Sequence, residues 1–199
     1  MVLTLPDWVH PNVSEPALLD YGFWSKPALG GKHTRTNRPG NRFAVEFGFP
    51  SVPSDIHGAQ LKSRIIAAKT EPLRLPVIQG ALPLTATGEP VVNGISVTGT
   101  TIPMRGFHPN TVIREGRLFT VERGDDACLH MVRHEVIADA NGNASVTIHP
   151  PLRVILDDGD RCEFSAPYMV GIIEGERIGW RDRLDRLLDV DGFTLVEET

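Results

Sequence analysis

The clearest alternation of apolar and polar residues lies in the central part of the chain, residues 116–167. In the segment 144–149, Ala, Val and Ile occupy the even positions and Ser, Thr and His the odd ones. Because side chains alternate between the two faces of a β-strand, this pattern places the apolar residues on one face, towards a core. Residues 128–139 form a second β-rich run, and the segment 140–143 between the two runs contains Asn-Gly. Because Asn-Gly favours a type I′ turn with both central residues at positive φ, we predict a β-hairpin here.

Two further strands are predicted around this hairpin. Residues 117–122 precede it and end in the polar turn 123–126, and residues 161–166 follow the Asp- and Gly-rich turn 157–160. Four strands in series, joined by polar turns, indicate a meander that can curl into a small barrel or sandwich.

The first part of the chain is rich in Pro, Gly and Asn and shows little periodicity before residue 43. Three aromatic residues, Trp8, Phe23 and Trp24, are spaced along it. We predict that they anchor an extended arm, residues 1–40, on a core or on a neighbouring subunit. Strong alternation then begins, with Phe or Val at every second position, and predicts a strand over residues 43–49.

One segment after this strand has helical periodicity. Its apolar stripe consists of Gly58, Leu61, Ile65 and Ala68, spaced i, i+3, i+7 and i+10. Ser54 is the predicted N-cap, Asp55 favours the first turn, and we expect the helix to end near residues 69–70, before Pro72. A strand at the edge of a sheet is predicted over residues 73–78, because it contains a proline.

Weaker patterns predict short strands at residues 94–98, 101–104 and 111–113, and a final strand at residues 193–198. The segment 172–180 is compatible with a short strand or a loop. The segment 182–189 has leucines at helical spacing, although its charges also suit an irregular turn.

Composition favours a mainly β chain, since 19 Gly and 16 Pro residues accompany a single helical pattern. The formal net charge of −5 argues against nucleic acid as the main partner, although residues Lys32, Arg35, Arg38 and Arg42 are a local basic exception. The first residues do not resemble a signal peptide, and no segment approaches the ~20 apolar residues that span a bilayer. Two cysteines fit a chain folded in a reducing cytoplasm.

Four residues, Cys128, His130, His134 and Cys162, could in principle bind zinc if neighbouring strands bring them together. Their spacing matches no established zinc motif, so we expect core cysteines, solvent- or partner-facing histidines, and no metal or other cofactor. The aspartates of turn 157–160 lack the complete spacing of a calcium loop. We find no nucleophile elbow, phosphate loop or dinucleotide motif, and we do not expect an enzyme.

Three blocks of sequence together resemble the distal tail proteins of long-tailed phages and related tail-like particles. The first is the strand at 41–48 with the following helix and strand, and the third is the final segment 192–198. The second block, residues 137–153, is the most telling, because it runs from the Asn-Gly turn into Pro-Pro-Leu-Arg.

The resemblance implies a mainly β fold in two parts. A β-sandwich-like belt domain with one helix would comprise residues 1–80, completed by a C-terminal strand near 190–199. A small β-barrel-like or meander domain would comprise residues 81–170, and residues 171–189 would connect the two.

The resemblance also implies a structural role in the virion, after synthesis in the host cytoplasm. The protein would form a homo-hexameric ring at the tail tip, between the tail tube protein and the baseplate hub protein, without inserting into a membrane. Trp8, Phe23 and Trp24 are the candidate subunit contacts. Two alternatives remain: a carbohydrate- or receptor-binding module in which Trp8, Trp24 or Trp180 stacks on sugars, and a hydrolase with a dispersed site.

Overall fold

The computed structural model describes residues 2–28, 30–36, 38, 40–80, 87–124 and 126–197. Within these residues, one α-helix accompanies nineteen short strands, and six of the strands close into a barrel. The predicted fold class, mainly β with one helix and a small barrel, is therefore confirmed. Some predicted segments, namely residues 81–86, Asp125, Glu198 and Thr199, fall outside the described residues.

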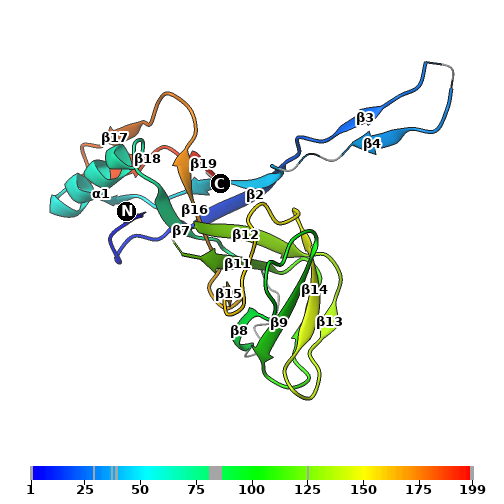
Figure 1. Ribbon diagram of the computed structural model, residues 1–199. Helices are drawn as coiled ribbons and strands as arrows, with labels where there is room; N and C mark the ends of the chain where they lie inside the picture. Colours follow the sequence, from blue (N-terminus) through cyan, green and yellow to red (C-terminus); the bar gives the residue numbers. More distant parts are fainter. Residues whose placement is uncertain are drawn as a thin grey trace.

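A six-stranded sheet, here called the belt sheet, forms the first module (Figure 1). In order across the sheet its strands are β1 (Leu3–Thr4), β7 (Leu73–Pro76), β16 (Tyr168–Ile173), β19 (Phe193–Glu197), β5 (Arg42–Gly48) and β2 (Val13–Leu19). Only β1 and β7 are parallel; the other neighbours are antiparallel. The predicted strands at 43–49 and 73–78 are thus present as β5 and β7. The predicted edge position of the second is wrong, because β7 lies between β1 and β16. The sheet joins the N-terminal strands β1 and β2 to β16 and β19 from the C-terminal part of the chain.

The helix α1 (Ile56–Ala67) buries Gly58, Leu61 and Ile65, as its apolar stripe predicts. The predicted N-cap is wrong: the cap is Asp55, whose Oδ1 accepts the backbone N–H of His57 at 2.7 Å. Ser54 instead donates its hydroxyl to Asp182 Oδ1 at 2.7 Å. This bond ties the helix start to a second, three-stranded sheet.

That second sheet consists of β17 (Trp180–Asp182), β18 (Leu187–Val190) and β6 (Val52–Pro53). The helical alternative for residues 182–189 is wrong, because β17 and β18 pair through a turn in which Arg186 has a φ of 63°. Leu184 precedes Arg186 in this turn and Leu187 and Leu188 follow it in β18, so their helical spacing does not reflect a helix.

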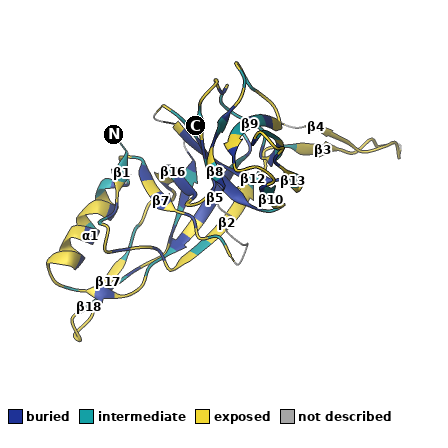
Figure 2. Cartoon of the chain, turned by 90° about the horizontal axis from the view of Figure 1, so that it is seen from below, coloured by how far each residue is buried: buried dark blue, intermediate teal, exposed yellow. Residues whose placement is uncertain are grey.

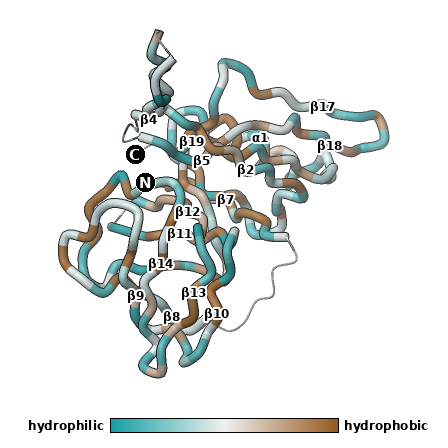
Figure 3. The backbone as a smooth tube through the Cα atoms, turned by 90° about the vertical axis from the view of Figure 1, so that its right-hand side faces the viewer, coloured by the Kyte–Doolittle hydropathy of each residue, from teal (hydrophilic) through white to brown (hydrophobic). Residues whose placement is uncertain are grey.

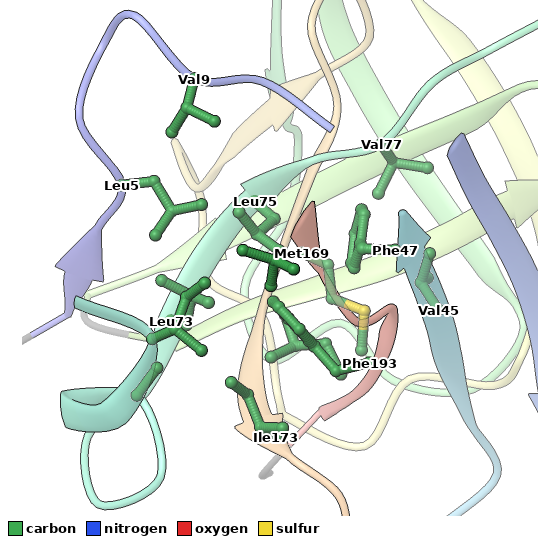
Figure 4. Close-up of a cluster of buried hydrophobic side chains, with 14 of the residues drawn as sticks. Leu5, Val9, Val45, Phe47, Leu73, Leu75, Val77, Met169, Ile173 and Phe193 are labelled. Carbon is green, nitrogen blue, oxygen red and sulfur yellow. The ribbon is translucent and has the colours of Figure 1, made fainter. Parts of the chain in front are cut away.

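The core of the belt module lies between the belt sheet, α1 and the N-terminal segment (Figure 4). Phe47, Met169 and Leu75 project from three strands of the sheet and are at most 1% exposed. Leu5 and Val9 pack onto the same cluster from the N-terminal segment. The first half of the predicted arm therefore packs on the core of its own subunit, which is one of the two predicted alternatives, and it contributes the strands β1 and β2.

The second module is the closed barrel, whose strands run in the order β11 (Leu118–Arg123), β12 (Asp126–Val132), β14 (Ala144–His149), β9 (Thr101–Phe107), β8 (Gly88–Val92) and β15 (Arg161–Glu163). Figure 3 shows it beside the belt sheet, with hydrophobic stretches in both modules. Phe119 and Phe164 stack in its core with ring centroids 4.3 Å apart. Leu118 and Leu129 lie on β11 and β12 but pack into the belt core, so the two modules share these barrel strands.

The segment 94–98, predicted as a strand, forms only an isolated bridge between Val97 and Leu156. Gly94 and Ser96 have φ values of 154° and 54°, which interrupt the extended chain expected from the sequence pattern. Strand β8, just before it, was missed.

The central hairpin differs from its prediction in turn type and in pairing. Of the turn residues, Gly142 has a φ of 77° whereas Asn141 is not at positive φ, so the turn is not type I′. Asp139 Oδ1 accepts the N–H groups of both Asn141 and Asn143 at 2.8 Å, and this side chain stabilises a different turn. The two predicted runs do pair, since Met131 and Val132 of β12 lie opposite His149 and Ile148 of β14. The end of the first run does not join them, because strand β13 (Val136–Ile137) pairs with β10 (Val112–Ile113) instead.

Candidate subunit interface

A hairpin projects from the belt sheet, away from the rest of the molecule (Figure 1). Strands β3 (Phe23–Ser25) and β4 (Thr34–Thr36) pair in it, and every residue of both strands is exposed (Figure 2). The polypeptide enters from β2 and returns through β5, so the hairpin prolongs the β2–β5 pair beyond the sheet. We call residues 20–42 the arm.

The base of the arm is fixed by a polar network around Asp20. Its carboxylate accepts hydrogen bonds from Arg35 Nη2 at 2.6 Å, from the N–H of Gly22 at 2.9 Å and from Asn41 Nδ2 at 3.0 Å. Asn41 Oδ1 in turn accepts the N–H of Tyr21 at 2.8 Å. The bond from Arg35 is the main cause that lowers the pKa of Asp20. The carboxylate therefore stays charged, and the network sets the direction in which the arm leaves the sheet.

Three aromatic rings of the arm each carry an arginine over one face. The guanidinium carbons of Arg35, Arg38 and Arg42 lie 5.6, 5.4 and 5.7 Å from the ring centroids of Trp24, Phe23 and Tyr21, respectively. These are cation–π distances. The rings are still 47–56% exposed. The arm thus presents large apolar rings and positive charge side by side to whatever it meets.

The charge of the arm is opposite to that of the rest of the protein. The arm contains five Lys or Arg residues and one Asp, a net charge of +4. Because the whole protein has a net charge of −5, the remaining residues together carry −9. The arm is therefore a basic projection on an otherwise acidic protein.

The structure places the three predicted contact residues in two locations. Phe23 and Trp24 lie on the arm, whereas Trp8 lies near the opposite edge of the belt sheet, with its ring 5.0 Å edge-on from that of His57 in α1. Trp8 is 40% exposed. Their role in subunit contact stays a prediction, but they do not belong to one segment.

A hollow lies at the edge of the belt sheet formed by β1 and β7. Two adjoining cavities of about 260 and 270 Å³ share Thr4, Arg74 and Tyr168 in their walls. The Arg74 guanidinium carbon lies 3.5 Å from the centroid of the Tyr168 ring, and Tyr168 donates its hydroxyl to Glu122 Oε1 at 2.7 Å. We call this hollow the N-terminal groove. Sequence analysis missed it, because its walls come from four distant segments of the sequence.

The residues considered for zinc are not arranged on one strand face. Cys128 and His130 are buried on β12, but that strand ends at Val132 and His134 is exposed beyond it. Val121 pairs with Cys128 on one side and Cys162 on the other, so a whole strand separates the cysteines. Among the described residues, no group of three or more His, Cys, Asp or Glu side chains could hold a metal ion. Burial raises the pKa of the Cys162 thiol, which therefore stays protonated.

His130 is buried on β12 of the barrel, so the expectation that it faces solvent or a partner is wrong. Its Nδ1 lies 3.1 Å from the carbonyl oxygen of Pro150, which can only accept, so Nδ1 carries the proton. Burial lowers the pKa of His130 to about 4. The neutral ring is the form that the fold accommodates.

We expect this histidine to make the fold sensitive to acid. A lowered folded-state pKa contributes stability that is present above about 6.5 and is lost as the pH falls towards 4, by up to about 3 kcal/mol. Urea unfolding of the wild-type protein and of the His130→Gln variant at pH 7 and pH 4.5 measures this loss of stability. The free energy of unfolding should fall more for the wild-type protein; equal losses would contradict this reasoning.

The described part of the protein has no helix with the length and apolar character needed to cross a membrane. Comparison of the sequence with protein-family models and with curated proteins finds no match.

Proposed function

We propose that this protein is a structural subunit of a phage tail tip or a related tail-like particle, where it forms a homo-hexameric ring between the tail tube and the baseplate hub. The observation that carries the proposal is the arm. Exposed aromatic rings stacked with arginines are typical of residues that dominate the energy of protein interfaces. Here they lie on a hairpin that projects from its own subunit, so their burial requires a partner.

The number of copies and the position in the particle rest on the resemblance of the sequence blocks to distal tail proteins. The two modules are consistent with that resemblance, since a belt sheet with one helix lies beside a small barrel. The role is structural rather than catalytic in this proposal.

The alternative role in sugar binding has less support. Stacking on a sugar needs an open aromatic face, and Arg35 already covers one face of Trp24. Trp8 packs edge-on against His57, and Trp180 lies on β17, in a different sheet. The arm favours a protein partner instead.

Sedimentation velocity over a range of concentrations tests the proposal. The full-length protein should form a concentration-dependent oligomer. Phe23→Ser with Trp24→Ser should weaken association by about 100-fold or more, because each buried ring contributes on the order of 1–3 kcal/mol. A matched control, Ile95→Ser with Leu184→Ser, removes two apolar side chains that are at least 82% exposed elsewhere. A folded wild-type protein that stays monomeric at every concentration would overturn the proposal.

A further inference from the structure

The arm and the N-terminal groove lie at opposite edges of the same sheet. In the order β1-β7-β16-β19-β5-β2, the arm prolongs the last two strands and the groove borders the first two. Figures 1 and 2 show the N-terminal edge and the arm on opposite sides of the body. A contact between these two surfaces would join unlike edges of neighbouring copies.

The walls of the groove complement the arm in polarity. One end has an apolar lining that includes Leu5, Pro6, Val9 and Pro76. Such a surface suits an aromatic ring.

The groove also complements the arm in charge. Three carboxylates line it: Asp7 at the apolar end, and Glu122 and Asp126 at the other. Its arginine, Arg74, lies over the Tyr168 ring. The carboxylates therefore face a basic arm across any contact made here.

We propose that the N-terminal groove of one copy receives the arm of the next copy. The aromatic end of the arm, with Phe23 and Trp24, packs into the apolar end of the groove. The cationic side chains at the tip, Lys26 and Lys32, face Asp7 and Asp126. This inference rests on the proposed ring function and names the surface that completes it.

The contact is heterologous, because the two surfaces differ and lie at opposite edges. Such a head-to-tail contact leaves a free arm at one end of every assembly and a free groove at the other. It therefore repeats until the ends meet, which yields a closed ring where the rotation between copies permits it. Trp8 follows the groove residue Asp7 and precedes the groove residue Val9, so it lies on the receiving side of this contact, whereas Phe23 and Trp24 lie on the inserted arm.

Charge reversal tests the pairing. The arm variant carries Lys26→Glu and Lys32→Glu, and the groove variant carries Asp7→Lys and Asp126→Lys. All four positions are exposed, so folding should be unaffected, and circular dichroism checks this. Alone, each variant should associate at least about 10-fold more weakly than the wild type, the loss of roughly 1.4 kcal/mol or more. Mixed in equal amounts, the two variants should assemble again, because each reversed arm then meets a groove of opposite charge.

A control with Glu174→Lys and Glu176→Lys makes the same change in net charge as the groove variant at exposed positions outside the groove, and it should assemble like the wild type. If the arm variant fails to assemble while the groove variant assembles normally, the arm docks elsewhere: the groove assignment is then wrong and the proposed function stands. If the mixture fails to recover, the groove assignment is likewise wrong. If the wild-type protein itself never assembles, both proposals fail.

Discussion

Replacing Arg153 by alanine should lower the free energy of unfolding by about 3–5 kcal/mol at pH 8, the cost of leaving a buried charge without its partner. Arg153 Nη2 lies 2.5 Å from Glu197 Oε2, and the two side chains are 6% and 1% exposed. Glu197 Oε1 also accepts the backbone N–H of Leu129. The pair connects the loop after β14 of the barrel to the last strand of the belt sheet, so its loss weakens the junction of the two modules.

The cost of this substitution should depend on pH, in a direction set by Glu197. Burial raises the pKa of Glu197 to about 7, and Arg153 opposes that rise. A carboxyl group with a raised folded-state pKa contributes stability that is fully present below about 4.5 and is lost as the pH rises through 7. Without Arg153, a protonated Glu197 is the less costly buried form.

Urea unfolding of the Arg153→Ala protein at pH 8 and pH 5.5 measures the effect. The deficit relative to the wild type should be smaller at pH 5.5. Adding Glu197→Gln to the same variant should recover part of the stability at pH 8, since no buried charge remains. A deficit below about 1 kcal/mol at pH 8 would mean that solvent reaches the pair and screens it.

The elements that could be predicted from sequence are those whose pattern is local. Alternation within β5 and the i, i+3, i+7 spacing of α1 depend on neighbouring residues, and both elements are present. By contrast, β2 has the sequence Val-Ser-Glu-Pro-Ala-Leu-Leu, which does not alternate. It is a strand because all seven residues pair with β5, a partner more than twenty residues away. Strand β16 was predicted only at its end, in the segment 172–180, for the same reason, since its partners β7 and β19 are distant in sequence.

The same distinction applies to the candidate interface. Phe23 and Trp24 could be identified as contact candidates because large aromatic residues are conspicuous in a polar segment. Their stacking with Arg38 and Arg35 depends on how the arm folds back on itself. The N-terminal groove and the Arg153–Glu197 pair depend on segments that meet only in the folded protein, and no spacing in the sequence indicates either.

Replacing Gly142 by alanine is the second substitution for which we expect a large loss of stability. Its φ is 77°, and a Cβ there would lie 2.1 Å from the backbone oxygen of Phe107. Its own carbonyl oxygen accepts the N–H of Phe107 at 3.1 Å, so the turn is bonded directly to the end of β9. The methyl group of an alanine at this position would therefore clash with backbone that is held in place by the barrel.

Gly159 provides the matched comparison, since its φ is 92° and a Cβ there would have no heavy atom within 4 Å. Gly159→Ala should show the cost of positive φ alone, about 1–3 kcal/mol. Gly142→Ala should add the cost of a steric clash, for a total of about 3–5 kcal/mol. Thermal and urea unfolding of both variants separate the two contributions. Equal losses would mean that the 139–143 turn can move off β9 at little cost, and that the barrel closes without the Gly142–Phe107 contact.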